Sequence, residues 1–199
     1  MYKKISLLLS VLVLALSLAG CSDDTSIIVN EDFGGLTSVD QFWTAEYKSL
    51  PGDPSKPLYA NLEGDYELVD GKLKMIGSRF TIGTDRTTET TKEDTEAGGA
   101  LNLTKPYRIT IKFLEVGGDT NKKFSVMIDN NTTTGAASMH GNPGCRPFNA
   151  RLSELPEGNT IVIDVVDPAV GTENSFLQLR VEAGEGWIIL DSITVEYLP

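Results

Sequence analysis

Histidine and cysteine are scarce in this sequence, which holds one histidine and two cysteines among 199 residues. A Ser-His-Asp site would have to use His140, and no Gly-x-Ser-x-Gly motif accompanies it. Thiol-rich zinc centres and clusters of nitrogen ligands are excluded, because they need several such residues. The glycine patterns of nucleotide-binding loops are absent as well. The sequence therefore predicts a non-catalytic protein, although any two of its 28 acids could still pair as catalytic carboxylates.

Basic residues are also few. The chain has 17 lysines and arginines against 28 acids, for a formal net charge of −11. A protein this acidic repels a polyphosphate backbone, so nonspecific nucleic-acid binding is not expected.

The N-terminus has the order of a secretion signal. Met1 to Lys4 is positively charged, Ile5 to Leu18 is apolar, and Leu18-Ala19-Gly20-Cys21 closes the run. This segment resembles the lipobox of bacterial lipoproteins, in which the cysteine is acylated, with palmitate among the fatty chains, and becomes the first mature residue. The alternative is an ordinary signal peptide.

The resemblance implies three parts: a signal peptide over 1–20, lipidated Cys21 with a short tether over 21–26, and one domain over 27–199. Loss of Lys3 and Lys4 with the leader leaves 15 basic and 28 acidic residues, a charge of −13. About 180 residues suit a single core. The acidic Ser22-Asp23-Asp24 resembles an export tag, which implies attachment to the outer membrane or cell surface. Cys145 is then the only free thiol, expected to be half-buried, and we expect a monomer.

Two-residue alternation dominates after residue 27, and long 3.6-residue periods are absent. In Tyr107 to Phe113, Tyr107, Ile109, Ile111 and Phe113 face one side, while Arg108 and Lys112 face the other. With turn residues between segments, the pattern predicts an all-β, jelly-roll-like antiparallel sandwich of about ten strands. The other expected strands are Ile27–Phe33, Glu67–Ile76, Arg79–Ile82, Ala100–Leu103, Phe124–Ile128, Thr160–Val166, Leu177–Val181, Trp187–Leu190 and Ile193–Tyr197.

Two segments lack this rhythm. Leu50 to Pro57 is rich in proline, glycine and serine, and Thr84 to Gly99 is acidic and rich in threonine. Both are expected to be long exposed loops, either functional or merely solvated.

A third segment is rich in amides and hydroxyls. Asp129-Asn130-Asn131-Thr132-Thr133-Thr134 is followed by Ser138-Met139-His140-Gly141 and by Arg146. These groups can donate to and accept from sugar hydroxyls. A turn-rich loop has the same composition, so both interpretations stay open.

Several segments resemble an accessory module of secreted bacterial pectate lyases. They are Phe42-Trp43 to Leu50, Pro57-Leu58-Tyr59, Gly77 to Gly83, Leu103 to Ile109, Asp129 to Thr134 with Ser138 to Gly141, and Ser175 to Arg180. The resemblance implies a β-sandwich that binds plant cell-wall polysaccharide and holds it near degrading enzymes. A lyase's parallel β-helix would not fit in 199 residues, so lyase activity is not implied.

A pectin-like, uronate-containing ligand is a polyanion, so an acidic protein needs a local positive patch to bind it. Arginine holds a carboxylate through two parallel hydrogen bonds, and Arg79 and Arg180 are the preferred pair. The full set of candidate sugar-binding residues is Arg79, Asn130, Asn131, His140, Arg146, Gln178 and Arg180. Taken singly, each cation also fits a solvated strand position.

Exposed aromatic rings would allow sugar stacking, and Trp43, Tyr47 and Tyr59 are candidates. Tyr66 lies in the same irregular region, whereas Trp187 precedes an apolar strand and is expected in the core. Trp43 follows Phe42 and could equally be core.

A structural calcium ion is one further possibility. Glu31-Asp32 near the first strand and Asp191 near the last resemble the calcium site of jelly-roll sugar-binding modules. Calcium needs six to eight oxygens, and the alternative is that these acids cap turns and strand ends. No other cofactor is expected.

Two other functions stay open. A structural or protein-binding surface lipoprotein could use the same sandwich without a sugar ligand. A small polysaccharide lyase would need a groove with paired acids or an Arg or Lys base.

Overall fold

A computed structural model describes residues 27–83, 101–130, 145–167 and 173–199, without the side chains of Asp129 and Asn130. Almost all regular structure in it is antiparallel β-sheet, which confirms the predicted fold class. The elements are β1 (Ile27–Glu31), α1 (Val39–Phe42), β2 (Ser49–Leu50), β3 (Asp53–Pro57), β4 (Tyr59–Val69), β5 (Lys72–Ile82), β6 (Tyr107–Gly117), β7 (Lys123–Asn130), β8 (Phe148–Arg151), the 3-10 helix η4 (Leu152–Glu154), β9 (Thr160–Val165), β10 (Ser175–Val181) and β11 (Trp187–Tyr197).

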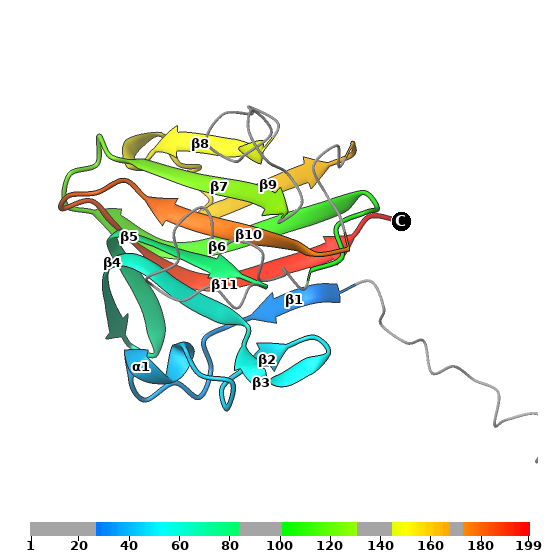
Figure 1. The fold of residues 1–199 in the computed structure, drawn as a ribbon. Coiled ribbons are helices and arrows are strands. Elements are labelled where there is room, and N and C mark those ends of the chain that lie inside the picture. The colour runs from blue at the N-terminus through cyan, green and yellow to red at the C-terminus, as the bar shows by residue number, and fades with distance from the viewer. Residues whose placement is uncertain (1–26, 84–100, 131–144, 168–172) are drawn as a thin grey trace, which may run out of the picture.

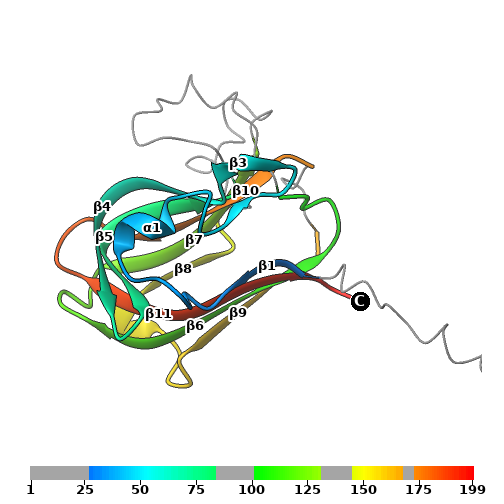
Figure 2. The ribbon, with the colours of Figure 1, turned by 90° about the horizontal axis from the view of Figure 1, so that it is seen from below.

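The strands form two layers that face each other across the core (Figures 1 and 2). One layer contains β4, β5, β10, β7 and β8, and the other contains β1, β11, β6 and β9. Strand β5 joins them, because its first half pairs with β11 and its second half with β10. The layers are therefore parts of one continuous sheet that folds over itself.

The bend in β5 is visible in its side-chain alternation. Leu73 and Met75 are buried before Gly77, whereas Phe80 and Ile82 are buried after it, so the inward phase shifts by one residue. Gly77 has a φ of 50°, and a Cβ there would lie 2.4 Å from the carbonyl oxygen of Gly184. Only glycine fits this close approach, and the phase shift lets one strand serve both layers.

The core lies between the layers and joins residues from β1 to β11. In β6 the predicted inward residues are all buried, including Tyr107 and Ile109, because alternation places them on the face toward the other layer. In β10 the inward set is Leu177, Leu179 and Val181. Phe176 faces the opposite side, where it packs with Met127 and Cys145 in a second small cluster. Cys145 is fully buried rather than half-buried.

Several expected boundaries were wrong. Glu67–Ile76 spans the turn at Asp70-Gly71 and belongs to two strands, while Arg79–Ile82 is the second half of β5. The two C-terminal candidates form one strand, β11. Leu101 makes only an isolated bridge to Ser175. Leu50–Pro57 is a short hairpin of β2 and β3 rather than a structureless loop, although most of its residues are exposed. Thr84–Gly99 lies outside the described residues.

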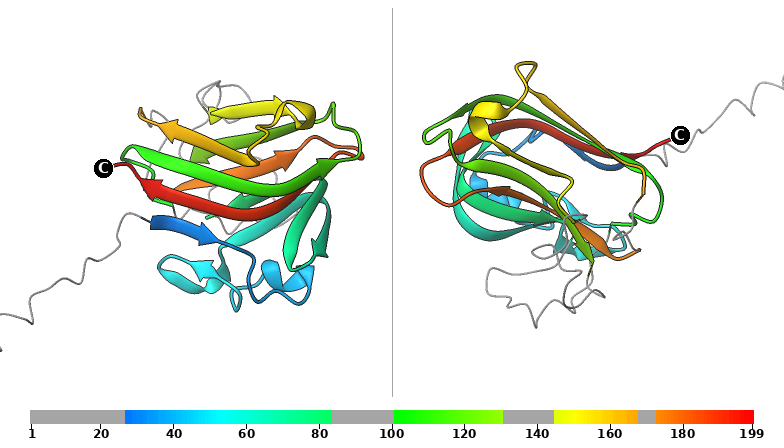
Figure 3. Two further views of the ribbon diagram at one scale, coloured as in Figure 1. Left: turned by 180° about the vertical axis from the view of Figure 1, so that it is seen from behind. Right: turned by 90° about the horizontal axis from the view of Figure 1, so that it is seen from above.

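Both described termini lie at one end of the sandwich. Ile27 pairs with Glu196 near the end of β11, and the C-terminus lies beside them (Figure 3). The β10–β11 connection, residues 182–186, lies at the opposite end. No helix among the described residues is long and apolar enough to cross a membrane.

Candidate functional site

The outer face of the β4-β5-β10-β7-β8 layer carries a row of polar side chains. On β10, Gln178 and Arg180 alternate with the inward leucines, as the sequence predicted. Arg180 pairs in register with Arg79 on β5 and with Ser125 on β7. Ser125 in turn pairs with Asn149 on β8, to which its hydroxyl donates a hydrogen bond of 2.9 Å. Residues from four strands thus form one line across the sheet.

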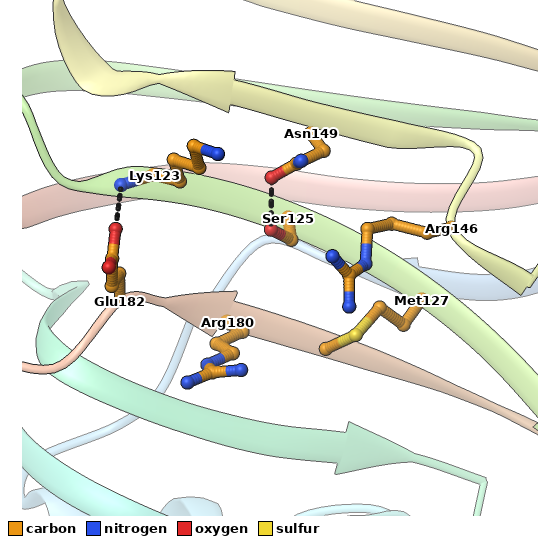
Figure 4. Close-up of a pocket in the computed structure, with 7 residues that line it drawn as sticks. All are labelled: Lys123, Ser125, Met127, Arg146, Asn149, Arg180 and Glu182. Atoms are coloured by element: carbon orange, nitrogen blue, oxygen red, sulfur yellow. Dashed lines mark hydrogen bonds between the residues drawn. The ribbon is translucent and has the colours of Figure 1, made fainter. Parts of the chain in front are cut away.

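A pocket of about 200 Å³ opens on this face beside Arg180 (Figure 4). Arg146, just ahead of β8, extends its guanidinium toward the same space, next to Met127. The residues that line the pocket are Lys123, Ser125, Met127, Arg146, Asn149, Arg180 and Glu182.

The pocket is cationic although the protein is acidic. Among the described residues that line it, Lys123, Arg146 and Arg180 are the basic ones and Glu182 is the one acid. One oxygen of that carboxylate accepts a hydrogen bond from the backbone N–H of Lys123 at 3.2 Å. Within the described parts of the chain, the ion pairs include none made by Arg146 or Arg180. The guanidinium groups of Arg146 and Arg180 therefore face the pocket without a carboxylate partner from the described residues, which suits an anionic ligand.

Arg79 lies next in the row and, unlike Arg180, has an acidic partner among the residues that the structure describes. Its Nε atom lies 2.8 Å from an oxygen of Glu63 on β4. The Arg79 side chain is 31% exposed and the Glu63 side chain is 46% exposed, so both are in contact with solvent.

A neutral polar pair lies two residues along the strands from Arg180 and Arg79. Gln178 pairs in register with Thr81, and both residues are buried. Gln178 Oε1 and Thr81 Oγ1 have no hydrogen-bond partner within the described parts of the chain. Buried polar groups are usually satisfied, so this pair is an unusual feature of the face.

Four of the residues predicted to bind sugar lie on this face: Arg79, Arg146, Gln178 and Arg180. Asn130 ends β7, and its side chain is not described, while Asn131 and His140 lie outside the described residues. The pocket residues Lys123, Ser125 and Asn149 were not predicted from the sequence. The alternation of β7 held a usable signal for the first two, since Phe124, Val126 and Ile128 point inward.

Of the three aromatic candidates, Tyr59 is buried, whereas Trp43 and Tyr47 keep part of their surface exposed. Tyr59 is fully buried and stacks on Phe42 with ring centroids 4.2 Å apart, so its prediction was wrong. Trp43 and Tyr47 are partly buried, and their ring centroids lie 4.7 and 5.9 Å from that of Phe42. Tyr66 packs edge-on against Trp43 at 4.8 Å. These rings form a cluster that covers the core.

Trp187 also departs from expectation. It is only partly buried, and Lys74 Nζ lies 4.8 Å from its ring centroid on the surface of the sheet.

The predicted calcium ligands do not converge on one point. Glu31 is fully buried and accepts hydrogen bonds from the hydroxyls of Tyr47 at 2.7 Å and Tyr59 at 2.6 Å, and from the backbone N–H of Phe33. Lys48 Nζ lies 3.0 Å from its carboxylate. Burial, followed by the Glu31 interactions, raises the pKa of Tyr59 far above its usual range. Glu31 is therefore a satisfied structural anion.

The other two acids surround a lysine. Lys72 Nζ lies 2.8 Å from an Asp191 carboxylate oxygen and donates to the backbone carbonyls of Asp191 at 3.1 Å and Asp32 at 3.0 Å. An Asp32 carboxylate oxygen accepts the backbone N–H of Gly34 at 2.9 Å, which lowers the pKa of that acid. Among the described residues, no three histidine, cysteine or acidic side chains are grouped to hold a metal. The predicted grouping was therefore wrong.

No protein-family model matches the chain, and no curated protein matches it. Several solved structures overlap part of the fold. One is the CBM22-1–GH10 part of xylanase 10B from Clostridium thermocellum, complexed with xylohexaose, with a TM-score of 0.46 and 12% identity. The match covers 87% of this chain but only 29% of the xylanase chain.

Two other matches are of similar quality. The xylan-binding module CBM86 from Roseburia intestinalis has a TM-score of 0.38 and 15% identity over 71% of this chain and 90% of its own. The K3 adhesin domain of Lys-gingipain from Porphyromonas gingivalis has a TM-score of 0.44 and 12% identity. That match covers 86% of this chain and 99% of the adhesin domain. Likeness at this level concerns chain topology and identifies no ligand.

Proposed function

We propose that the protein binds a uronate-containing polysaccharide, pectin-like first, on the outer face of the β4-β5-β10-β7-β8 layer, held at the cell surface by a lipid on Cys21. The observation that carries the proposal is the grouping of Arg180 with Arg146 and Lys123 around one pocket, with Arg79 beside Arg180 in register. A carboxylate can accept two parallel hydrogen bonds from one guanidinium. Neighbouring strands are about 4.8 Å apart, so adjacent arginines can engage neighbouring carboxylates of one chain.

The charge balance favours a polyuronate over nucleic acid. Duplex DNA carries about one charge per 1.7 Å, and a protein with 28 acids repels so dense a polyanion. A polyuronate has one carboxylate per sugar ring, together with hydroxyls that Ser125 and Asn149 can bond. Local attraction can prevail, because charges farther than about 8 Å are screened at physiological salt.

The rival protein-binding function has less support among the described residues. Four large apolar side chains are exposed there: Ile27, Leu114, Val162 and Val166. They come from three different strands and the segment after β9, and scattered exposed apolar residues are normal on protein surfaces.

Titration of the full chain with polygalacturonate and with a neutral glucan, at two salt concentrations, tests the proposal. We expect saturable binding to polygalacturonate that weakens with salt. Arg180→Gln should weaken it about tenfold or more, because it removes charge-assisted hydrogen bonds. Arg108→Gln is the matched control, since Arg108 lies on the other layer and pairs with Asp164 at 2.6 Å.

Three results would overturn the proposal. They are no saturable binding by a folded protein, equal binding to the neutral glucan, and equal losses in the two arginine variants. Ultraviolet absorbance of the ligand is recorded in the same samples, because formation of an unsaturated uronate would identify a lyase instead.

A further inference from the structure

Among the described residues, Glu63 is the acid that forms an ion pair with the row of arginines on the outer face. Strand β4 pairs with β5 through two register shifts, one on each side of Glu63. Gly64 follows with a φ of 85°, and a Cβ there would lie 2.4 Å from the Cα of Ser78. Such irregularities redirect side chains, and here they bring Glu63 opposite Arg79.

The contact between Glu63 and Arg79 is close but poorly aligned. The Arg79 Nε atom lies 2.8 Å from the carboxylate, yet it has no hydrogen-bond partner among the described residues, Glu63 included, so its N–H does not point at that oxygen. The pair Lys74 and Glu67 on the same two strands differs, because its 2.9 Å ion pair is also a hydrogen bond. An incoming carboxylate that approaches the guanidinium edge-on would satisfy it better than Glu63 does.

We infer that Glu63 is a built-in competitor for the ligand's carboxylate at Arg79. The inference rests on the proposed function and adds a regulatory element to the same site. With Glu63 in place, Arg180 is free of acidic partners among the described residues and Arg79 is not. Binding across both arginines requires the ligand to displace Glu63 from Arg79. Ligands with several linked carboxylates can do so, whereas a single sugar acid gains too little beyond Arg180.

The opposite role would be that Glu63 positions Arg79 for the ligand, and the two roles predict opposite signs. A competitor weakens binding, so Glu63→Gln should tighten it. A positioning residue strengthens binding, so the same substitution should loosen it. Because the Glu63 side chain is 46% exposed, its substitution should leave the fold intact, as melting temperature will verify.

The test measures dissociation constants of an oligogalacturonide and of monomeric galacturonate for full-chain variants. Glu63→Gln should tighten oligomer binding about two- to fivefold, the factor that corresponds to the ~0.5–1 kcal/mol of an exposed ion pair. Glu67→Gln is the matched control for the lost negative charge. Glu67 lies four residues, about 13 Å, farther along β4, beyond the screening length of about 8 Å, so its effect should be small.

A double-mutant cycle locates the effect. In an Arg79→Gln background the gain from Glu63→Gln should disappear, because no guanidinium is left to release. Equal or weaker oligomer binding by Glu63→Gln, or an equal gain in Glu67→Gln, overturns the inference. In those cases an Arg180-dependent affinity of the unmodified protein still supports the proposed function. No saturable binding by any variant overturns both.

Discussion

The hydrogen bond from Tyr59 to the buried carboxylate of Glu31 leads to a prediction about the stability of the fold. The Tyr59 hydroxyl donates a 2.6 Å hydrogen bond to Glu31, and both residues are fully buried. Tyr59→Phe removes this bond and keeps the ring that stacks on Phe42. A hydrogen bond to a buried charge contributes about 1.5–3 kcal/mol, so the free energy of unfolding should fall by about 2 kcal/mol. For a chain of this size the melting temperature should drop by about 4–8 °C.

Tyr107 provides the matched control. It is also fully buried, but its hydroxyl has no hydrogen-bond partner in the part of the chain that the structure describes. Tyr107→Phe removes the same atom and relieves an unsatisfied polar group, so stability should stay the same or rise by up to about 1 kcal/mol.

Urea unfolding at pH 7, followed by near-ultraviolet circular dichroism and tryptophan fluorescence, measures both variants against the unmodified protein. Equal m-values are required, so that midpoint shifts report stability. If the two variants lost the same stability, or if Tyr59→Phe lay within about 0.5 kcal/mol of the parent, the argument that the Glu31 bond stabilises the fold would be refuted.

Two further predictions concern pH and the bend in β5. Burial raises the pKa of Tyr59 and of Tyr107 above the value of about 10 found in unfolded chains, so the unfolded state loses these protons first. The contribution of these two tyrosines to the free energy of unfolding should be fully present below pH 10. Above pH 10 the free energy of unfolding should fall by up to about 1.4 kcal/mol per pH unit for each tyrosine. The double variant Tyr59→Phe/Tyr107→Phe should show a smaller slope in melting curves recorded across this pH range. Gly77→Ala should cost about 3 kcal/mol or more, because its Cβ would meet backbone at 2.4 Å, whereas Gly71→Ala, with no atom within 4 Å, should cost about 1–2 kcal/mol. Equal costs in urea titrations would contradict the close-approach argument.

Strand alternation was the part of the fold that the sequence predicted well. Tyr107 to Phe113 and Leu177 to Val181 each bury one face, and that periodicity requires no knowledge of strand partners. The same reasoning placed Arg180 on an outward face. Strand β4 was largely missed, because Gly64 and the acids around it interrupt any two-residue pattern.

The arrangement of the site depends on contacts that one segment alone cannot reveal. Arg79 and Arg180 lie about 100 positions apart in the chain, and only the register between β5 and β10 makes them neighbours. The prediction for Tyr59 was wrong for a related reason. Tyr47 and Tyr59 look like exposed rings in an irregular segment, but both donate to Glu31, a partner on β1.

The pairing of β1 with β11 also determines how the molecule would carry tension. Ile27 enters at the end of the sandwich opposite the β10–β11 connection, and Arg180 lies near that connection. A pull on the chain ahead of Ile27, resisted by a ligand at Arg180, would run along the strand axes. Antiparallel hydrogen bonds lie across those axes, so the β1–β11 bonds would be loaded together in shear instead of being peeled one at a time.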